Sequence, residues 1–543
     1  MAKKRKQSLM IAALTSSFGI FISKALGLLY YSPLSSLAGE ENMAFYSIAY
    51  TYYDLLLKIS SAGIPFAIAA LVSRYYAKED YKTVLLIKKM GISIVMGLTF
   101  IVALGFLFLS GPLARQSMGS GASVEDIAHL QNIFLILLVA VILVPFLSAI
   151  RGYYQGLKRL DLYGSSQALE QLVRVACIIG LGFLFVRILN FDSIYAIYMA
   201  IAAAGIAAFV TIIFFLRLTK ADDKHINQLI KSQESKAVSK DLLLQELISL
   251  SVPYLLISFL GSLSSLINST FFMDTVAKAG MDVTQAKLEM GILLANCNKL
   301  SSIPQVLTLG FSAGLVPYLS ESLEQQDVKK LNNQIIQLIE TVLYILVPAV
   351  CVFLFFGKDI YYIMYGNNNL EVGAKLFRWY CLVTFTDTIA PIFSSIMITL
   401  RLKKEATLAL LASCFVKLVT FFILVRIYGA NGMTFSTAIS SLFVIIAYMF
   451  ILKKCFGTKF TLTLRKFLFI IIASLLMIAP VKFVHILIGF EYTSRIVDIV
   501  ILSICGIFML LIYYEASVFF NLPQQIFNIK TPSVKAILKR FRK

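Results

Sequence analysis

The apolar residues of this 543-residue chain are grouped into blocks of twenty or more, and these blocks constrain its fold more than any other feature. An α-helix rises about 1.5 Å per residue, so about 20 apolar residues cross the hydrocarbon core of a bilayer, which is about 30 Å thick. Charged residues make up only 14% of the chain, against about 25% in soluble domains. The sequence therefore predicts an all-α integral membrane protein and excludes an ordinary soluble enzyme.

Fourteen of these blocks have the length of a membrane-spanning helix. The first follows the basic run Lys3–Lys6 and continues to about residue 31, which is longer than the apolar core of a cleaved signal peptide. We predict the other spans near residues 44–72, 84–111, 129–150, 166–188, 192–217, 247–274, 286–318, 333–356, 376–400, 406–428, 430–452, 467–488 and 496–519.

Basic residues are distributed unevenly between the two sides of this arrangement. If the N-terminus is cytoplasmic, most of the 49 Lys and Arg residues lie on the cytoplasmic side, where positive charge is retained during insertion. Their excess over the 29 Asp and Glu residues gives a formal charge of +20, which suits loops that face anionic lipid and requires no nucleic acid as a partner. We therefore predict a multi-pass protein of the bacterial cell (plasma) membrane with both termini cytoplasmic.

Short strings from the first half of the chain recur in the same order in the second half, each offset by six spans. Such offsets are typical of transporters built from parallel repeats. Lys58-Ile59-Ser60-Ser61 recurs as Lys299-Leu300-Ser301-Ser302, Leu157-Lys158 after Pro145 recurs as Leu402-Lys403 after Pro391, and Arg174 recurs as Lys417.

The repeat predicts the domain organisation. We expect two six-helix lobes related by a pseudo-twofold axis, followed by two extra helices. The predicted parts are an N-lobe at residues 1-220, a cytoplasmic linker at 221-246, a C-lobe at 247-455, and a segment at 456-543 that holds spans 13 and 14 and a basic cytoplasmic tail.

Cationic side chains inside the predicted spans are candidate functional groups, because a charge at the bilayer centre costs several kcal/mol on insertion scales. We predict that they line a central cavity and bind the substrate, whereas residues near span ends can instead extend their charge to the interface. A cavity with excess positive charge suits an anion such as phosphate or pyrophosphate. The cationic set is Lys24, Lys58, Arg174, Lys299 and Lys417.

Two acidic residues have the spacing to pair with members of this set. Asp54 lies four residues before Lys58, and Glu170 lies four residues before Arg174. Residues at this spacing share one face of a helix, so they can neutralise one another, and a purely structural role for the two pairs is the alternative.

Glycine and proline predict breaks in two of the spans, at Gly63 and Pro65 in the second and at Pro304 and Pro317 in the eighth.

Residues 151–159, at the predicted cytoplasmic interface, combine two glycines, two tyrosines and three basic residues. This composition is typical of a basic anchor with an aromatic belt. The alternative is a docking lip for an anionic lipid head group, formed by Arg151, Gln155, Lys158 and Arg159.

The sequence contains no nucleotide-binding or zinc-protease motif, and its seven cysteines form no CxxC pair. We therefore predict no catalytic site, no metal and no cofactor. The expected driving force is the membrane potential or an ion gradient.

Three stretches resemble the MOP exporter superfamily: Ile22-Ser23-Lys24-Ala25-Leu26-Gly27, the run Arg151-Gly152-x-x-Gln155-Gly156 with Gln167, Glu170 and Arg174 after it, and residues 309–320. Within the superfamily, the chain resembles the polysaccharide-exporter branch of Gram-positive bacteria that includes the stage V sporulation protein B and YtgP group. It is similar, more distantly, to the MurJ lipid II flippases.

This resemblance implies a MOP/MATE-like fold and a flippase that moves an undecaprenyl-pyrophosphate-linked cell-wall precursor, lipid II, from the inner to the outer leaflet by alternating access. The alternatives are a flippase for another lipid-linked polysaccharide, of capsule, teichoic acid or spore cortex, and a MATE-type cation or drug antiporter. An antiporter of that kind needs buried carboxylates without paired lysines, and this chain has the reverse balance.

The MurJ resemblance also assigns roles to residues and partners. It places Lys299 at the position of an essential arginine in the eighth span and Lys24 at an arginine position in the first. It implies a groove for the isoprenoid tail beside spans 13 and 14, while the lack of an acid in the eleventh span argues against a sodium site there. The implied partners are the lipid-linked glycan, membrane lipids and cell-wall synthesis enzymes, for a monomeric transporter.

Overall fold

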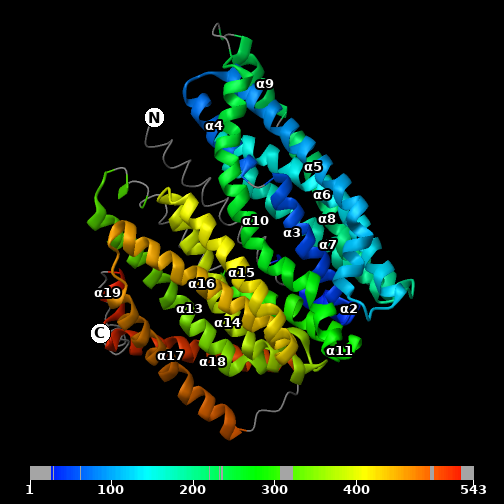
Figure 1. Cartoon of the computed structure of the whole chain (residues 1–543), viewed down its shortest axis with the longest axis vertical. Helices are drawn as coiled ribbons and strands as arrows, with labels where there is room; N and C mark the ends of the chain where they lie inside the picture. Colours follow the sequence, from blue (N-terminus) through cyan, green and yellow to red (C-terminus); the bar gives the residue numbers. More distant parts are fainter. Residues whose placement is uncertain are drawn as a thin grey trace, which may run out of the picture. The chain divides into compact units, whose positions relative to one another are not determined.

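The computed structural model describes residues 26–27, 30–61, 63–218, 220–231, 233, 237–305, 319, 322–323, 325–488 and 494–527 (Figure 1). Every regular element among them is helical, which confirms the predicted all-α class. The chain divides into two compact units, Met1–Gly291 and Ile292–Lys543.

In the first unit, α6 packs against α3, α4, α5 and α8, and α7 packs against α8. The helix α10, coloured green in Figure 1, runs along α3, α4 and α5. The elements are α2 (Tyr31–Ala38), α3 (Met43–Ser61), α4 (Ile64–Ala77), α5 (Tyr81–Met118), α6 (Val124–Gly156), α7 (Leu160–Phe183), the π-helix η1 (Leu184–Ile188), α8 (Ile194–Leu218), α9 (Lys220–Lys231), α10 (Lys240–Lys278) and α11 (Val283–Gly291).

In the second unit, α14 packs against α13 and α16, and α15 packs against α16. The helices α17 and α18 pack on each other and on α13, around a small apolar core. The elements are the π-helix η2 (Ile292–Cys297), a helical stretch at residues 298–305, α13 (Val328–Tyr365), α14 (Leu370–Thr399), α15 (Lys403–Tyr428), α16 (Ala430–Phe456), α17 (Thr461–Ile488), α18 (Arg495–Phe519) and α19 (Leu522–Phe527).

Twelve helices in the described part of the chain are long and apolar enough to cross a membrane. They coincide with twelve of the predicted spans, so the protein is a multi-pass membrane protein. The first predicted span lies almost wholly outside the described residues, and the eighth lies partly outside them. The total of fourteen stays a prediction.

A break divides the second predicted span into α3 and α4. Gly63 stands between them with a φ of +81°, and Pro65 lies in the first turn of α4. Glycine adopts this left-handed conformation without a steric penalty, and proline is tolerated in a first turn because its missing N–H has no helical partner there. Pro304 is buried in the helical stretch 298–305, and Pro317 lies outside the described residues.

The helices α5 and α13 repeat one another in length and at both ends. Each has 38 residues. Each begins after an aspartate, Asp80 or Asp327, whose side chain accepts a hydrogen bond from a backbone N–H of the first turn. Each ends at a glycine of positive φ, +79° at Gly119 and +83° at Gly366. These two helices, which are six predicted spans apart, therefore repeat one another in structure.

The turn between α6 and α7 also matches the turn between α14 and α15. Lys158 has a φ of +62° and Arg401 a φ of +63°. The N–H of Lys158 donates to the Gln155 carbonyl at 3.0 Å, and the N–H of Arg401 donates to the Ile398 carbonyl at 3.1 Å. The string match had instead paired Lys158 with Lys403, which was wrong by two residues. Backbone hydrogen bonds define equivalent positions in a turn, whereas surface lysines recur by chance.

The residues between the predicted lobes are partly helical. The expected linker, 221-246, contains most of α9 and the first turns of α10. Near its middle, Gln233 holds the turn between α4 and α5: its side-chain amide donates to Asp80 at 2.8 Å, and its carbonyl accepts from the Lys82 ammonium at 2.6 Å. Because α10 packs on α3, α4 and α5, it belongs to the first compact unit, while the lobe boundaries of the sequence repeat stay a prediction.

Candidate functional site

Helix α3 carries an ion pair near the middle of the membrane span Met43–Ala77. The Lys58 ammonium lies 2.5 Å from the Asp54 carboxylate and donates a 2.7 Å hydrogen bond to Ser262 on α10. The Asp54 side chain is 48% exposed and the Lys58 side chain 34%. The pair expected from the spacing is present, and it is open enough for a ligand to reach.

A second ion-paired cluster lies on α6 and α7, where one carboxylate serves two arginines. Glu170 accepts a 2.6 Å hydrogen bond from Arg174 and a 2.8 Å hydrogen bond from Arg151, which lies near the end of α6. Arg151 also donates to Ser166 at 2.9 Å. The Glu170–Arg174 pair was expected from its spacing, but the participation of Arg151 was not.

Tyrosines of α3 connect the two clusters. Tyr50 and Tyr53 lie beside the Arg174 guanidinium, and Tyr50 is also within electrostatic reach of Asp54 and Glu170. The Tyr50 side chain is 45% exposed, so it borders open space and not a packed core. Sequence reasoning missed this residue, although tyrosines at 46, 50 and 53 have the spacing of one helix face.

We call these residues the tyrosine-lined cluster: Asp54, Lys58, Arg151, Glu170 and Arg174, with Tyr50 and Tyr53. Its three cations exceed its two carboxylates by one positive charge. Two of its donors, Nη2 of Arg151 and Nε of Arg174, are buried and make no hydrogen bond to any described residue. Buried, unused donors beside excess positive charge favour a ligand with anionic acceptor oxygens.

The predicted docking lip does not have the expected form. Residues 151–156 complete helix α6 and do not form a loop, and Arg151 is 7% exposed. At these residues α6 packs closely against α4 and is not free at the interface. A Cβ at Gly152 would stand 2.5 Å from the Pro65 carbonyl oxygen, and one at Gly156 would stand 2.6 Å from Val72. Of the other lip residues, Gln155 and Arg159 are half-buried and Lys158 is exposed.

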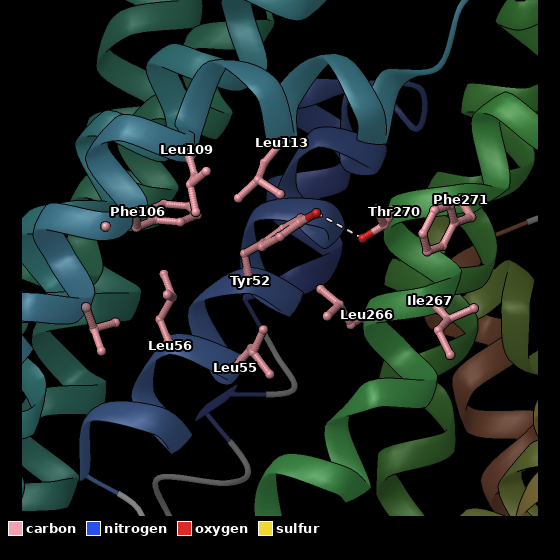
Figure 2. A pocket seen from close by; sticks show the side chains of 12 residues that line it. Tyr52, Leu55, Leu56, Phe106, Leu109, Leu113, Leu266, Ile267, Thr270 and Phe271 are labelled. Atoms are coloured by element: carbon pink, nitrogen blue, oxygen red, sulfur yellow. Dashed lines mark hydrogen bonds between the residues drawn. The ribbon is translucent and has the colours of Figure 1, made fainter. Parts of the chain in front are cut away.

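An apolar pocket of about 400 Å³ lies between α3, α5 and α10. Figure 2 shows its wall, with Leu55 and Leu56 of α3, Phe106, Leu109 and Leu113 of α5, and Leu266, Ile267 and Phe271 of α10 around Tyr52. A hydrogen bond of 2.9 Å joins the hydroxyls of Tyr52 and Thr270 at one side of it. This pocket is not predictable from the sequence, because its wall comes from helices far apart in the chain.

Lys299 lies in the second unit, where it is half-buried in the helical stretch 298–305. It is the second residue after the end of the π-helix η2. Asn296 of η2 donates to the Tyr361 hydroxyl at 2.9 Å, and the Tyr365 hydroxyl donates to the Asn296 carbonyl at 3.2 Å. Single-turn π-helical segments often mark functional sites. The contacts to α13 thus hold an irregular turn next to Lys299. Lys24 lies outside the described residues.

Lys417 lies inside the second unit and is 0% exposed. Its ammonium donates to Ser436 at 2.8 Å and to Thr437 at 2.7 Å, both on α16, and lies 5.3 Å from the centre of the Phe421 ring. A side chain enclosed in this way does not line an open cavity in this conformation, in contrast to the expectation from the sequence.

Other charged groups of the second unit connect α17 to α13. Lys466 lies 2.7 Å from Glu340, and His485 lies 3.2 Å from Asp359. Among the described residues, no group of three or more His, Cys, Asp or Glu side chains suits a metal ion. These pairs stabilise the packing of α17, one of the two C-terminal helices, against α13 within the second unit.

Similar proteins extend these observations. The chain is 27% identical to lipid II flippase MurJ of Bacillus subtilis (strain 168) over 482 residues, which cover 87% of this chain and 88% of the relative. It is 24% identical to stage V sporulation protein B of the same organism over 364 residues, which cover 65% of this chain and 66% of that protein.

Among solved structures, lipid II flippase MurJ in an inward closed conformation matches with a TM-score of 0.65 and 19% identity, covering 94% of this chain and 99% of that one. An inward-facing multidrug resistance MATE transporter of the MOP superfamily matches with a TM-score of 0.59 and 14% identity, covering 81% of this chain and 99% of that one. These likenesses confirm a MOP-superfamily fold. The family described as polysaccharide biosynthesis protein matches residues 12–323, which are more than half of the chain. The protein therefore belongs to the polysaccharide biosynthesis protein family.

Proposed function

We propose that this protein is a flippase that moves an undecaprenyl-pyrophosphate-linked cell-wall precursor, lipid II, from the inner to the outer leaflet by alternating access. The observation that carries the proposal is the tyrosine-lined cluster, in which three cations face two carboxylates inside a membrane-spanning unit. Buried charge in a membrane is expensive and usually functional, and an excess of arginine and lysine suits phosphate oxygens. The likeness to lipid II flippase MurJ along 87% of the chain supports this substrate.

In this proposal the pyrophosphate binds at the cluster, and Arg151 and Arg174 supply the hydrogen-bond donors that no described residue uses. Lys299, in the second unit, is a separate candidate for contact with the substrate during the transport cycle. In this proposal both termini are cytoplasmic. Movement of a net anion to the outside is favoured when the outside is positive, by about 2.3 kcal/mol per charge per 100 mV. The protein acts in this proposal as a transporter and not as an enzyme.

A second candidate is a flippase for another lipid-linked polysaccharide, which the likeness to stage V sporulation protein B favours. The same cationic cluster suits any pyrophosphate-linked lipid, because it recognises the phosphate and not the sugar. A cation antiporter is not supported, since it needs an excess of carboxylates at the binding site.

Complementation tests the proposal. In cells depleted of their own lipid II flippase, this protein is expected to restore growth, and the variant Arg174→Ala is expected not to, although it accumulates in the membrane. Restoration only in cells that lack the flippase of another lipid-linked glycan would support the second candidate. Restoration in neither strain, with the protein present in the membrane, would refute both.

A further inference from the structure

The apolar pocket between α3, α5 and α10 has no use in the function proposed so far. It is lined by Tyr52, Thr270 and ten residues without polar side chains, and its volume is about 400 Å³. The two hydroxyls at its side are already engaged: Tyr52 and Thr270 lie 2.9 Å apart, and Tyr52 is also 3.1 Å from Ser117. A polar occupant would lose its water without gaining partners, so the pocket suits a hydrocarbon.

One part of the wall leaves open space in the pocket. A Cβ added to Gly105 would meet no atom within 4 Å. Leu109, one turn further along α5, is 54% exposed at the edge of the pocket. The neighbouring exposed side chains of α5, Phe100, Ile101 and Phe108, are also large and apolar, as expected for a helix surface in contact with lipid. The pocket is thus accessible to a chain from the bilayer.

The position of the pocket relates it to the ion pair of α3. Leu55, in the pocket wall, comes three residues before Lys58, and Leu266 comes four residues after Ser262. Because Lys58 and Ser262 are hydrogen-bonded to each other, the ion pair lies about one helical turn, about 5 Å, from the pocket along both helices. An amphiphile with an anionic head and a hydrocarbon chain can therefore contact both at once.

The position of the Asp54–Lys58 pair along its helix distinguishes two lipids that could supply the hydrocarbon chain, the transported lipid and an ordinary phospholipid of the bilayer. Lys58 lies near the middle of the span Met43–Ala77, whereas the head groups of ordinary phospholipids stay at the membrane surface. A phospholipid whose head group is held at the membrane surface therefore does not bring that head group to Lys58, whereas a head group that enters the transport path does.

We propose that this pocket holds the segment of the polyprenyl chain next to the pyrophosphate of the transported lipid, while the Asp54–Lys58 pair contacts the pyrophosphate. The inference rests on the proposed function and adds to it a binding site for the lipid chain in the first unit. The pocket is a part of the transport site, because it orders the chain at the point where it meets the head group.

The experiment fills the pocket and leaves the cluster intact. The full chain and the variants Gly105→Ala, Gly105→Leu and Gly105→Phe are purified into phosphatidylglycerol nanodiscs, and the binding of undecaprenyl pyrophosphate and of inorganic pyrophosphate is measured. Undecaprenyl pyrophosphate should bind about tenfold more weakly to Gly105→Leu, and more weakly still to Gly105→Phe. Gly105→Ala should bind nearly as the wild type does, and inorganic pyrophosphate should not distinguish the variants.

The matched control is Gly97→Leu. Gly97 lies on the same helix, and a Cβ there also meets no atom within 4 Å, but Gly97 does not line the pocket. This variant should bind both ligands as the wild type does.

Each other outcome has a definite meaning. Equal affinity of Gly105→Phe and the wild type for undecaprenyl pyrophosphate would overturn the inference and leave the proposed function standing. Displacement of the bound lipid by phosphatidylglycerol, in proportion to its concentration, would assign the pocket to bulk lipid and also overturn the inference. A wild-type protein that binds neither undecaprenyl pyrophosphate nor lipid II would instead refute the proposed function.

Discussion

Arg174 and Lys417 occupy the same position in the two copies of the repeat, but their charges are stabilised differently. Arg174 follows Leu160, the first residue of α7, by fourteen residues, and Lys417 follows Lys403, the first residue of α15, by the same number. Arg174 lies 2.6 Å from Glu170 on its own helix, whereas Lys417 donates to Ser436 and Thr437 of α16. The first copy thus has a cation within an ion-paired cluster beside open space, and the second has an enclosed cation bound by hydroxyl groups.

This contrast predicts that Lys417→Met, combined with Asp387→Asn, retains transport. The Lys417 side chain is 0% exposed, and Ser436 and Thr437 also donate to the Met433 carbonyl, so neither hydroxyl loses every partner. Asp387 lies within electrostatic reach of Lys417, so Lys417→Met is combined with Asp387→Asn, because removing both charges of a buried pair is often neutral or stabilising, whereas removing one of them is destabilising. Growth of flippase-depleted cells measures the result. Loss of growth with normal membrane accumulation would mean that this pair becomes accessible in another state of the transport cycle.

The shared carboxylate predicts unequal effects of two substitutions in the tyrosine-lined cluster. Glu170→Gln leaves Arg151 and Arg174 without a counter-charge, and breaking a buried pair costs about 3–5 kcal/mol. Arg151→Met leaves the neutral Glu170–Arg174 pair and should cost much less. Thermal unfolding of the purified variants measures the difference. Equal melting temperatures would show that Glu170 does not hold both arginines.

Lys299→Ala is expected to abolish transport while the protein still accumulates in the membrane. The residue is half-buried, so its removal takes away a cation without opening a large void. Lys299→Arg keeps the charge and should retain much of the activity, although the geometry of its donors differs. Growth of Lys299→Ala cells at the wild-type rate would exclude Lys299 from the substrate site.

Accessibility separates Lys58 from Lys417. In a chain without its seven native cysteines, Lys58→Cys should react readily with a small charged thiol reagent, because the Lys58 side chain is 34% exposed. Lys417→Cys should stay unmodified, because that side chain is enclosed. The rate of modification is followed by mass spectrometry, and similar rates at the two sites would contradict this description of the cluster as open.

The contact between α4 and α6 predicts a defined loss of stability. In Gly152→Ala the new Cβ would stand 2.5 Å from the Pro65 carbonyl oxygen, and this backbone contact must widen. Such overpacking costs about 1–3 kcal/mol. The control is Gly97→Ala, which meets no atom within 4 Å and should stabilise its helix by about 0.5–1 kcal/mol. Melting temperatures that move in the same direction for both variants would refute this packing argument.

The sequence by itself determined the helical class, the position of most spans and the existence of the repeat. Apolar blocks such as residues 129–150 specify a membrane helix locally, because each buried side chain contributes to insertion almost independently of the rest of the chain. The Asp54–Lys58 and Glu170–Arg174 pairs were predictable for the same reason, since four residues on one helix set their distance.

Only the tertiary structure decided which groups meet across helices. The residues around Arg151 have the composition of an interface loop, but in the structure they complete α6, whose glycines pack on α4, and Arg151 lies 2.8 Å from Glu170 of α7. The match of Lys158 with Arg401 required the backbone hydrogen bonds of two turns, and the apolar pocket required helices from three separate parts of the chain. Hydropathy and helix spacing are local properties, whereas burial and choice of partner depend on contacts between residues far apart in the sequence, which no local pattern specifies.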